Sequence, residues 1–149
     1  MEKEQISPAE WQVMRVVWAN PQATSQFIID SLSQHFNWQA ATIKTLLGRL
    51  KNKGLISMHK KESKYYYQAA VTEEEQLDRS VEKLQSSICN KKQADLIKLF
   101  LEKGEFTKAD LKAISQLALK MSQHAPQQLI CNCLRGQCTC AQERSCRHD

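Results

Sequence analysis

Four of the six cysteines lie within ten residues, in the run CNCLRGQCTC of this 149-residue chain. They form the pattern CxC-x4-CxC, made by Cys131, Cys133, Cys138 and Cys140. Thiolate sulfur is a soft ligand that selects ions such as Zn(II) and Cu(I). Both sulfurs of a CxC pair can face one centre when the backbone bends, and Gly136 permits the chain to reverse between the pairs. The spacing therefore predicts a metal site.

The residues leave the identity of the metal open. Four thiolates can hold one Zn(II) tetrahedrally at about 2.3 Å, and Cu(I), which accepts two or three thiolates, could form a small bridged cluster on the same sulfurs. A metal-free dithiol redox site is the alternative. Cys146 and His148 are possible additional ligands, whereas Cys89, beside Ile88, is expected to be a buried core thiol.

Two other chemistries fit the cysteines less well. A disulfide framework spreads its cysteines to connect distant segments, whereas these are clustered. A zinc enzyme needs an open coordination position and a general base, and an all-thiolate site offers neither. The four histidines are scattered and form no catalytic constellation. We therefore predict no catalytic residues.

Positive charge is concentrated in one segment. The net charge is +5, and residues 38–70 carry seven Lys or Arg against one Glu, whereas residues 1–37 are net negative and 71–126 are neutral. A localised basic stripe is suited to binding phosphates. The alternative is a basic face that is merely solvated.

Local patterns place this basic segment on a helix and a hairpin. A capping box at Ser7, periodic apolar residues and Gly54 as a helix stop mark the boundaries. The predicted elements are, in order, a helix over 8–19, a helix capped by Thr24 or Ser25, a helix over 39–53, a strand over 55–59, a polar turn over 60–63 and a strand over 64–68. This is the order of a winged helix-turn-helix, whose second motif helix enters the major groove of DNA.

The helix over 39–53 has a polar face opposite its apolar stripe. Small residues there, Ala41 and Gly48, would let the backbone approach DNA closely. The predicted DNA-binding residues are Ala41, Thr42, Lys44, Thr45, Gly48, Arg49 and Asn52 on the helix and Lys60, Lys61 and Lys64 on the wing. Two alternatives remain open: Thr42 and Thr45 are simple helix surface, or the winged helix binds a protein.

Three further amphipathic helical segments follow, beginning at Thr72, near Leu96 and at Thr107. We expect them to form a homodimer interface, the alternative being that they pack only within their own domain. The predicted fold class is mainly α with a small β-hairpin. The expected domains are a winged helix over 1–70, a helical dimerisation region over 71–126 and a metal-binding tail over 127–149.

The stretches SPAEWQVMR at 7–15, WQAATIKTLLGRL at 38–50 and KGLI at 53–56 together resemble the penicillinase-repressor (BlaI/MecI) family. The cysteine motif resembles that of its copper-responsive, CopY-type branch. This resemblance implies a dimeric winged-helix repressor of a copper-export operon, bound to an inverted-repeat operator with Zn(II) and released when Cu(I) replaces Zn(II) at Cys131, Cys133, Cys138 and Cys140. A copper chaperone as Cu(I) donor is a possible partner.

Charge counting adds a hypothesis about the switch. Four thiolates carry the same net charge of −2 with one Zn(II) as with two Cu(I), so the switch is expected to act through shape. The rival functions are a β-lactam-responsive repressor of the same fold and a copper-storage or metallochaperone protein, which would not need the basic stripe. A cytoplasmic location without membrane contact is expected, since MEKEQISPAEW lacks a signal peptide's apolar core and no apolar run approaches about 20 residues.

Overall fold

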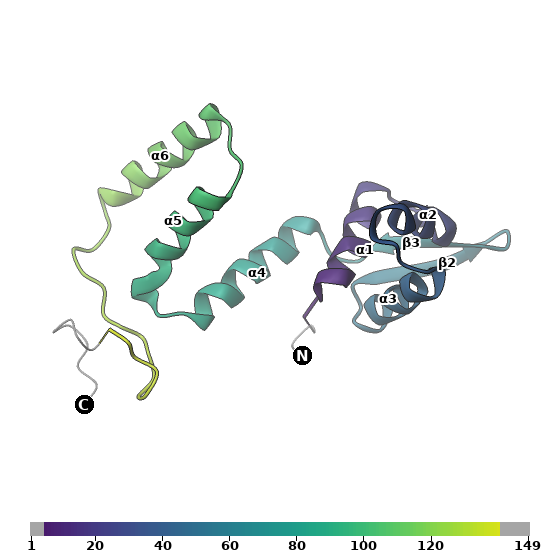
Figure 1. Ribbon diagram of the computed structural model, residues 1–149, viewed down its shortest axis with the longest axis horizontal. Helices are drawn as coiled ribbons and strands as arrows, with labels where there is room; N and C mark the ends of the chain where they lie inside the picture. Colours follow the sequence, from purple (N-terminus) through teal and green to yellow (C-terminus); the bar gives the residue numbers. More distant parts are fainter. Residues whose placement is uncertain (1–4, 141–149) are drawn as a thin grey trace. The chain divides into compact units, whose positions relative to one another are not determined.

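The computed structural model describes residues 5–140, which fall into two compact units, one ending at Arg79 and one beginning at Ser80. The chain is mainly helical, as the sequence predicted, and the predicted hairpin is joined by a short third strand in one small antiparallel sheet (Figure 1). None of the helices described between residues 5 and 140 has the length and apolarity to cross a membrane.

Three helices form the body of the first unit: α1 (Pro8–Ala19), α2 (Ser25–Phe36) and α3 (Ala40–Asn52). The sequence predicted α1 with these bounds. Thr24, rather than Ser25, caps α2, because its Oγ1 accepts a hydrogen bond of 3.2 Å from the backbone N–H of Phe27. The helix α3 begins and ends one residue inside the predicted range.

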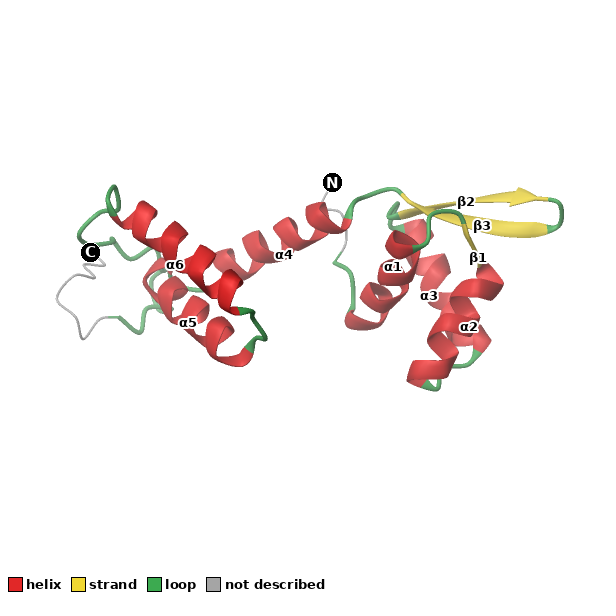
Figure 2. Ribbon diagram, turned by 90° about the horizontal axis from the view of Figure 1, so that it is seen from above, coloured by secondary structure: helices red, strands yellow, loops and turns green. Residues whose placement is uncertain are grey.

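The sheet has three antiparallel strands in the order β1–β3–β2: β1 (Ala23–Thr24), β2 (Ile56–Lys61) and β3 (Lys64–Ala69). The prediction of a four-residue turn over 60–63 was wrong, since Lys60 and Lys61 belong to β2 and only Glu62 and Ser63 form the turn. Both have positive φ, 50° and 69°, as two-residue hairpins with the native strand twist require. Figure 2 shows the hairpin extending past the helices of this unit.

The core of the first unit lies between the helices and the sheet. The apolar stripe of α3 is fully inside it, as the period of 3.6 predicted. Tyr67 is buried against this core while Tyr65, two residues away on the same strand face but nearer the tip, remains exposed. The largest fully buried side chains are Met14, Ile28, Ile43, Leu47, Leu50, Leu55, Val13 and Val17.

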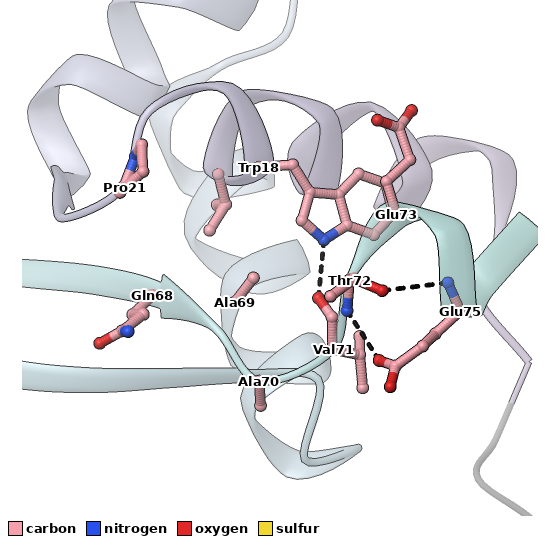
Figure 3. Close-up of a pocket in the computed structure, with 10 residues that line it drawn as sticks. Trp18, Pro21, Gln68, Ala69, Ala70, Val71, Thr72, Glu73 and Glu75 are labelled. Carbon is pink, nitrogen blue, oxygen red and sulfur yellow. Dashed lines mark hydrogen bonds between the residues drawn. The ribbon is translucent and has the colours of Figure 1, made fainter.

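A hydrogen-bonded joint connects β3 to the next helix, α4 (Glu73–Ser87) (Figure 3). The indole N–H of Trp18 donates to the carbonyl of Val71 at 2.9 Å. Thr72 and Glu75 form the predicted capping box, with Glu75 N–H donating to Thr72 Oγ1 at 3.1 Å and Thr72 N–H to Glu75 Oε2 at 2.8 Å. The residues of this joint, Trp18, Val71, Thr72 and Glu75, are among those that line the cleft drawn in Figure 3.

The second unit contains the 3₁₀ turn η1 (Asn90–Lys92) and the helices α5 (Gln93–Lys103) and α6 (Lys108–Ser122). Thr107 and Asp110 form a complete capping box at the start of α6, so Asp replaces the usual Glu there. Cys89 is the one buried residue in the described part of this unit, residues 80–140. Large apolar side chains are exposed on α4, whose first residues belong to the first unit, and on α5 and α6: Leu77, Val81, Leu84, Ile97, Leu99, Phe100, Leu111, Leu117, Leu119 and Met121.

An ion pair joins α1 to the end of α3. Glu10 is only 2% exposed, and its Oε2 accepts a hydrogen bond of 2.8 Å from Lys53 Nζ, which also donates to the carbonyl of Gln5. The predicted capping box at Ser7 is therefore half formed: Ser7 Oγ accepts from the Glu10 backbone N–H, but the Glu10 carboxylate bonds Lys53. Lys53, one of the cations of the basic segment, therefore stabilises the fold.

Replacing Lys53 by Met should strongly destabilise the first unit. Glu10 would remain buried without its cation, which we expect to lower the free energy of unfolding by about 3 kcal/mol. Urea denaturation measures this, with the exposed neighbour Lys51→Met as the matched control, expected to change stability by less than about 0.5 kcal/mol. Equal losses in the two variants would show that the pair does not hold α1 to α3.

Candidate metal centre and nucleic-acid interface

The structure exposes all ten residues that the sequence predicted to contact DNA. Seven lie on the face of α3 opposite the buried Ile43, Leu46, Leu47 and Leu50. Three lie on the hairpin of β2 and β3. The residues are Ala41, Thr42, Lys44, Thr45, Gly48, Arg49, Asn52, Lys60, Lys61 and Lys64. Because the apolar stripe fixes how α3 is rotated, these helix residues share one accessible surface.

Gly48 is not required by packing within the chain. A Cβ built at this position would meet no atom within 4 Å. Glycine in mid-helix costs about 1 kcal/mol relative to alanine, so its presence on this exposed face suits close approach by another molecule. The neighbouring Thr45 donates its hydroxyl hydrogen to the carbonyl of Ala41 at 2.9 Å, which leaves its oxygen lone pairs and methyl group toward solvent.

The wing concentrates cations at its tip. Lys61 and Lys64 lie directly opposite each other in the β2–β3 register, and like charges at such positions repel. Lys60 Nζ lies 5.7 Å from the centre of the Tyr65 ring, a cation–π distance. Because an approaching polyanion would relieve the repulsion between the two opposed lysines, the wing is suited to a phosphate backbone.

A cluster of thiols forms the second candidate site. Cys89 Sγ lies 3.7 Å from Cys131 Sγ and 3.5 Å from Cys140 Sγ, and Cys131 Sγ lies 3.6 Å from Cys138 Sγ. The sulfurs of Cys89, Cys131, Cys133 and Cys140 all lie within 4.8 Å of one another. The structure thus brings together the four predicted tail cysteines and adds a fifth.

The sulfur spacing fits a thiolate-bound metal ion. A tetrahedron with metal–sulfur distances of about 2.3 Å has edges of about 3.8 Å, close to the three sulfur–sulfur distances above. The donor set is all sulfur, which suits Zn(II) and Cu(I). The cysteines are unbridged thiols in this structure.

Thiols packed this closely resist ionisation. Hydrogen bonding with Cys131 and Cys89 raises the pKa of Cys133 to about 12. The pKa of Cys140 is also raised, first by hydrogen bonding with Cys89. A second thiolate beside a first is unfavourable unless a cation compensates both charges. A bound cation would therefore favour the ionised forms of Cys133 and Cys140.

The surroundings of Cys89 differ from those that the sequence predicted. It is buried, at 9% exposure, but it lies two residues beyond the end of α4 and against the tail thiols rather than in an apolar helix core. The partners are 42 and 51 residues further along the chain, so no local pattern could have revealed them. Cys146 and His148 lie outside the described residues.

The sequence pattern of the family described as "Penicillinase repressor" matches residues 6–120. An uncharacterized 16.5 kDa protein from the ptsI 3′ region of Latilactobacillus sakei is 32% identical over 93% of this chain and 95% of its own length. The methicillin resistance regulatory protein MecI of Staphylococcus aureus (strain N315) is 26% identical over 78% of this chain and 94% of its own.

Two solved structures are similar over a little less than half of the chain. One is the Bacillus licheniformis BlaI monomer in complex with the blaP half-operator, with 35% identity over 48% of this chain and 88% of that chain, at a TM-score of 0.44. The other is the CopR repressor, with 38% identity over 46% of this chain and 99% of that chain, at a TM-score of 0.40.

The family match covers more than half of the chain and ends at residue 120, before the cysteine motif. The matched part contains the helix-turn-helix and the hairpin wing. The family members are transcriptional repressors that bind DNA, and not enzymes. The chain therefore belongs to the penicillinase repressor family of DNA-binding transcriptional repressors.

Proposed function

We propose that this repressor senses copper. In the repressing state a Zn(II)-loaded homodimer binds an inverted-repeat operator of a copper-export operon, and uptake of Cu(I) by the tail thiolates releases it. The observation that carries this proposal is the converged thiol cluster in a chain whose first part is a winged-helix repressor. A repressor that responds to another class of signal has no need of five gathered cysteines.

The DNA-reading part of the proposal uses residues 1–70. The helix α3 enters the major groove with its exposed face, and Lys44 and Arg49 make its charged contacts. The wing lysines bind the flanking phosphates. Phosphate contacts position a protein and base contacts specify the site, so α3 supplies the specificity and the wing most of the salt-dependent affinity.

The dimeric state follows from the exposed apolar side chains of residues 71–126. The helices α4, α5 and α6 present large apolar residues to solvent, and the described part of the second unit has no apolar core of its own. Exposed apolar surface on this scale marks an interaction site. A second copy of the chain is the partner we propose, because a twofold dimer matches an inverted-repeat operator.

The tail, residues 127–149, is the segment that we propose to bind the metal ion. Cys131, Cys133, Cys138 and Cys140 provide thiolates for Zn(II) or Cu(I), and a copper chaperone is a suitable Cu(I) donor. Four thiolates carry a net −2 with one Zn(II) or with two Cu(I), so the charge facing DNA barely changes. The switch therefore works through the shape of the tail against the dimerisation helices.

The rival function is a response to β-lactams. MecI is named as a methicillin resistance regulatory protein, and a second relative, from Bacillus licheniformis, is named as a penicillinase repressor. That function leaves the cysteine cluster without a role. A copper-storage protein is disfavoured for the opposite reason, because it leaves the basic α3 and wing surface without a role.

Gly48→Ala should separate stability from DNA binding. A methyl group meets no atom within the chain, so the free energy of unfolding should rise by about 0.5–1 kcal/mol. The same methyl group would hold α3 away from the groove, so operator affinity should fall about tenfold. Urea denaturation and fluorescence anisotropy measure the two effects. Unchanged affinity in the stabilised variant would remove α3 from close contact with DNA.

Replacing Lys60, Lys61 and Lys64 with Gln should weaken binding to all DNA sequences similarly. Each lost phosphate contact should reduce the slope of log affinity against log salt by about 0.9. The control is Lys112→Gln, an exposed lysine on α6, which should leave the slope unchanged. If the triple variant keeps the parental slope, the wing does not contact the DNA backbone.

Zn(II) and Cu(I) should change the affinity of the protein for its operator in opposite directions. Anisotropy is measured with a labelled inverted repeat selected from random DNA by the zinc-loaded protein. Zn(II) should raise affinity at least about tenfold, and subsequent Cu(I) should reverse this change. Cys131→Ser should keep DNA binding but lose the metal response. Absence of DNA binding in every metal state would contradict the proposed function, and metal-independent binding would favour the rival repressor.

A further inference from the structure

The tail is attached to the segment after α4 by a pair of asparagines. The side-chain amide of Asn90 donates to the carbonyl of Ile130 at 2.7 Å, and its Oδ1 accepts from the backbone N–H of Asn132 at 3.3 Å. In return, Asn132 Oδ1 accepts from the backbone N–H of Asn90 at 3.0 Å. These reciprocal bonds require no metal ion.

This clamp sets the register between the two segments. Cys89 and Cys131 each directly precede one of the paired asparagines, so their sulfurs are brought to 3.7 Å. A second contact further along the tail, from Lys92 Nζ to Thr139 Oγ1 at 2.7 Å, lies beside Cys140. The Cys140 sulfur is 3.5 Å from Cys89. Cys89 is thus positioned between both CxC pairs.

We propose, on the basis of the proposed function, that the zinc site of the repressing state consists of Cys89, Cys131, Cys133 and Cys140. In a tetrahedral Zn(II) site with metal–sulfur distances of about 2.3 Å, the sulfurs lie about 3.8 Å apart, and sulfurs up to about 1 Å further apart reach this spacing by small side-chain shifts. The proposed four lie within 4.8 Å of one another, a set that does not include Cys138. In the repressing state Cys89 therefore takes the place of Cys138, which the proposed function counts among the thiolates that bind Zn(II) or Cu(I).

The consequence is a metal cross-link between distant parts of the chain. A site made by the tail alone closes a loop within residues 131–140. A site that includes Cys89 joins the tail to the residues directly after α4, across 42 positions to Cys131. Zn(II) binding would then order the segment between the helices α4 and α5, which carry the proposed dimer surface, as well as the tail itself.

The test compares Cys89→Ser with Cys138→Ser in the full-length protein. Co(II) is the probe for the zinc site, because its thiolate charge-transfer band scales with the number of bound sulfurs. Cys89→Ser should reduce this band by about one quarter per cobalt, as three of four thiolates remain. It should also lower Zn(II) affinity, measured against a chelator, by at least about 10-fold, and by more than Cys138→Ser does.

Two further variants distinguish ligation from a structural effect. Cys89→His restores a zinc ligand and should recover affinity that Cys89→Ser loses. Asn132→Ala should weaken Zn(II) binding while keeping the four-thiolate cobalt band. Far-UV circular dichroism verifies that each variant keeps its helices.

If Cys138→Ser lowered Zn(II) affinity more than Cys89→Ser does, the result would overturn the proposal in favour of a site made by the tail alone. Equal losses, or an unchanged cobalt band in Cys89→Ser, would overturn it as well. These results leave the proposed copper response intact as long as the parent protein still releases its operator with Cu(I). A parent protein that binds no Zn(II) would instead contradict the proposed function.

Discussion

The close packing of the thiols of Cys89 and the tail is the constraint on which the second unit depends. Cys89 is the only buried residue in the described range 80–140, and its neighbours are the sulfurs of the tail. Hydrogen bonding with the neighbouring thiols raises the pKa of Cys133. A soft metal ion allows several of them to ionise together. The most enclosed residue in the described part of this unit is thus also part of the proposed metal site.

The first unit is organised differently. An apolar core formed by three helices and the sheet defines it, and the Glu10–Lys53 pair joins α1 to α3. The same core fixes the rotation of α3, so its polar face and Gly48 face solvent. The surface proposed to read DNA is therefore held by packing, whereas the surface proposed to sense metal is held by polar bonds and sulfur.

Local signals in the sequence predicted much of the fold correctly. Ser7 and Thr24 as caps, the capping boxes at Thr72 and Thr107, and the apolar period of α3 are each determined by residues three or four positions apart. The errors have physical reasons. The predicted hairpin turn is too long, because polar residues such as Lys60 and Lys61 are typical of turns. Pairing with Tyr65 and Lys64 places them in β2 instead.

The sequence alone determined the chemistry of the chain: soft thiolate donors in a CxC-x4-CxC pattern, a basic segment, and a helix with one apolar and one polar face. Such features depend on residue type and short spacing. Only the tertiary structure decided that Lys53 neutralises Glu10 and that Cys89 joins the tail cysteines. Those contacts link residues more than 40 positions apart, and long-range contacts of this kind leave no periodic trace in the sequence.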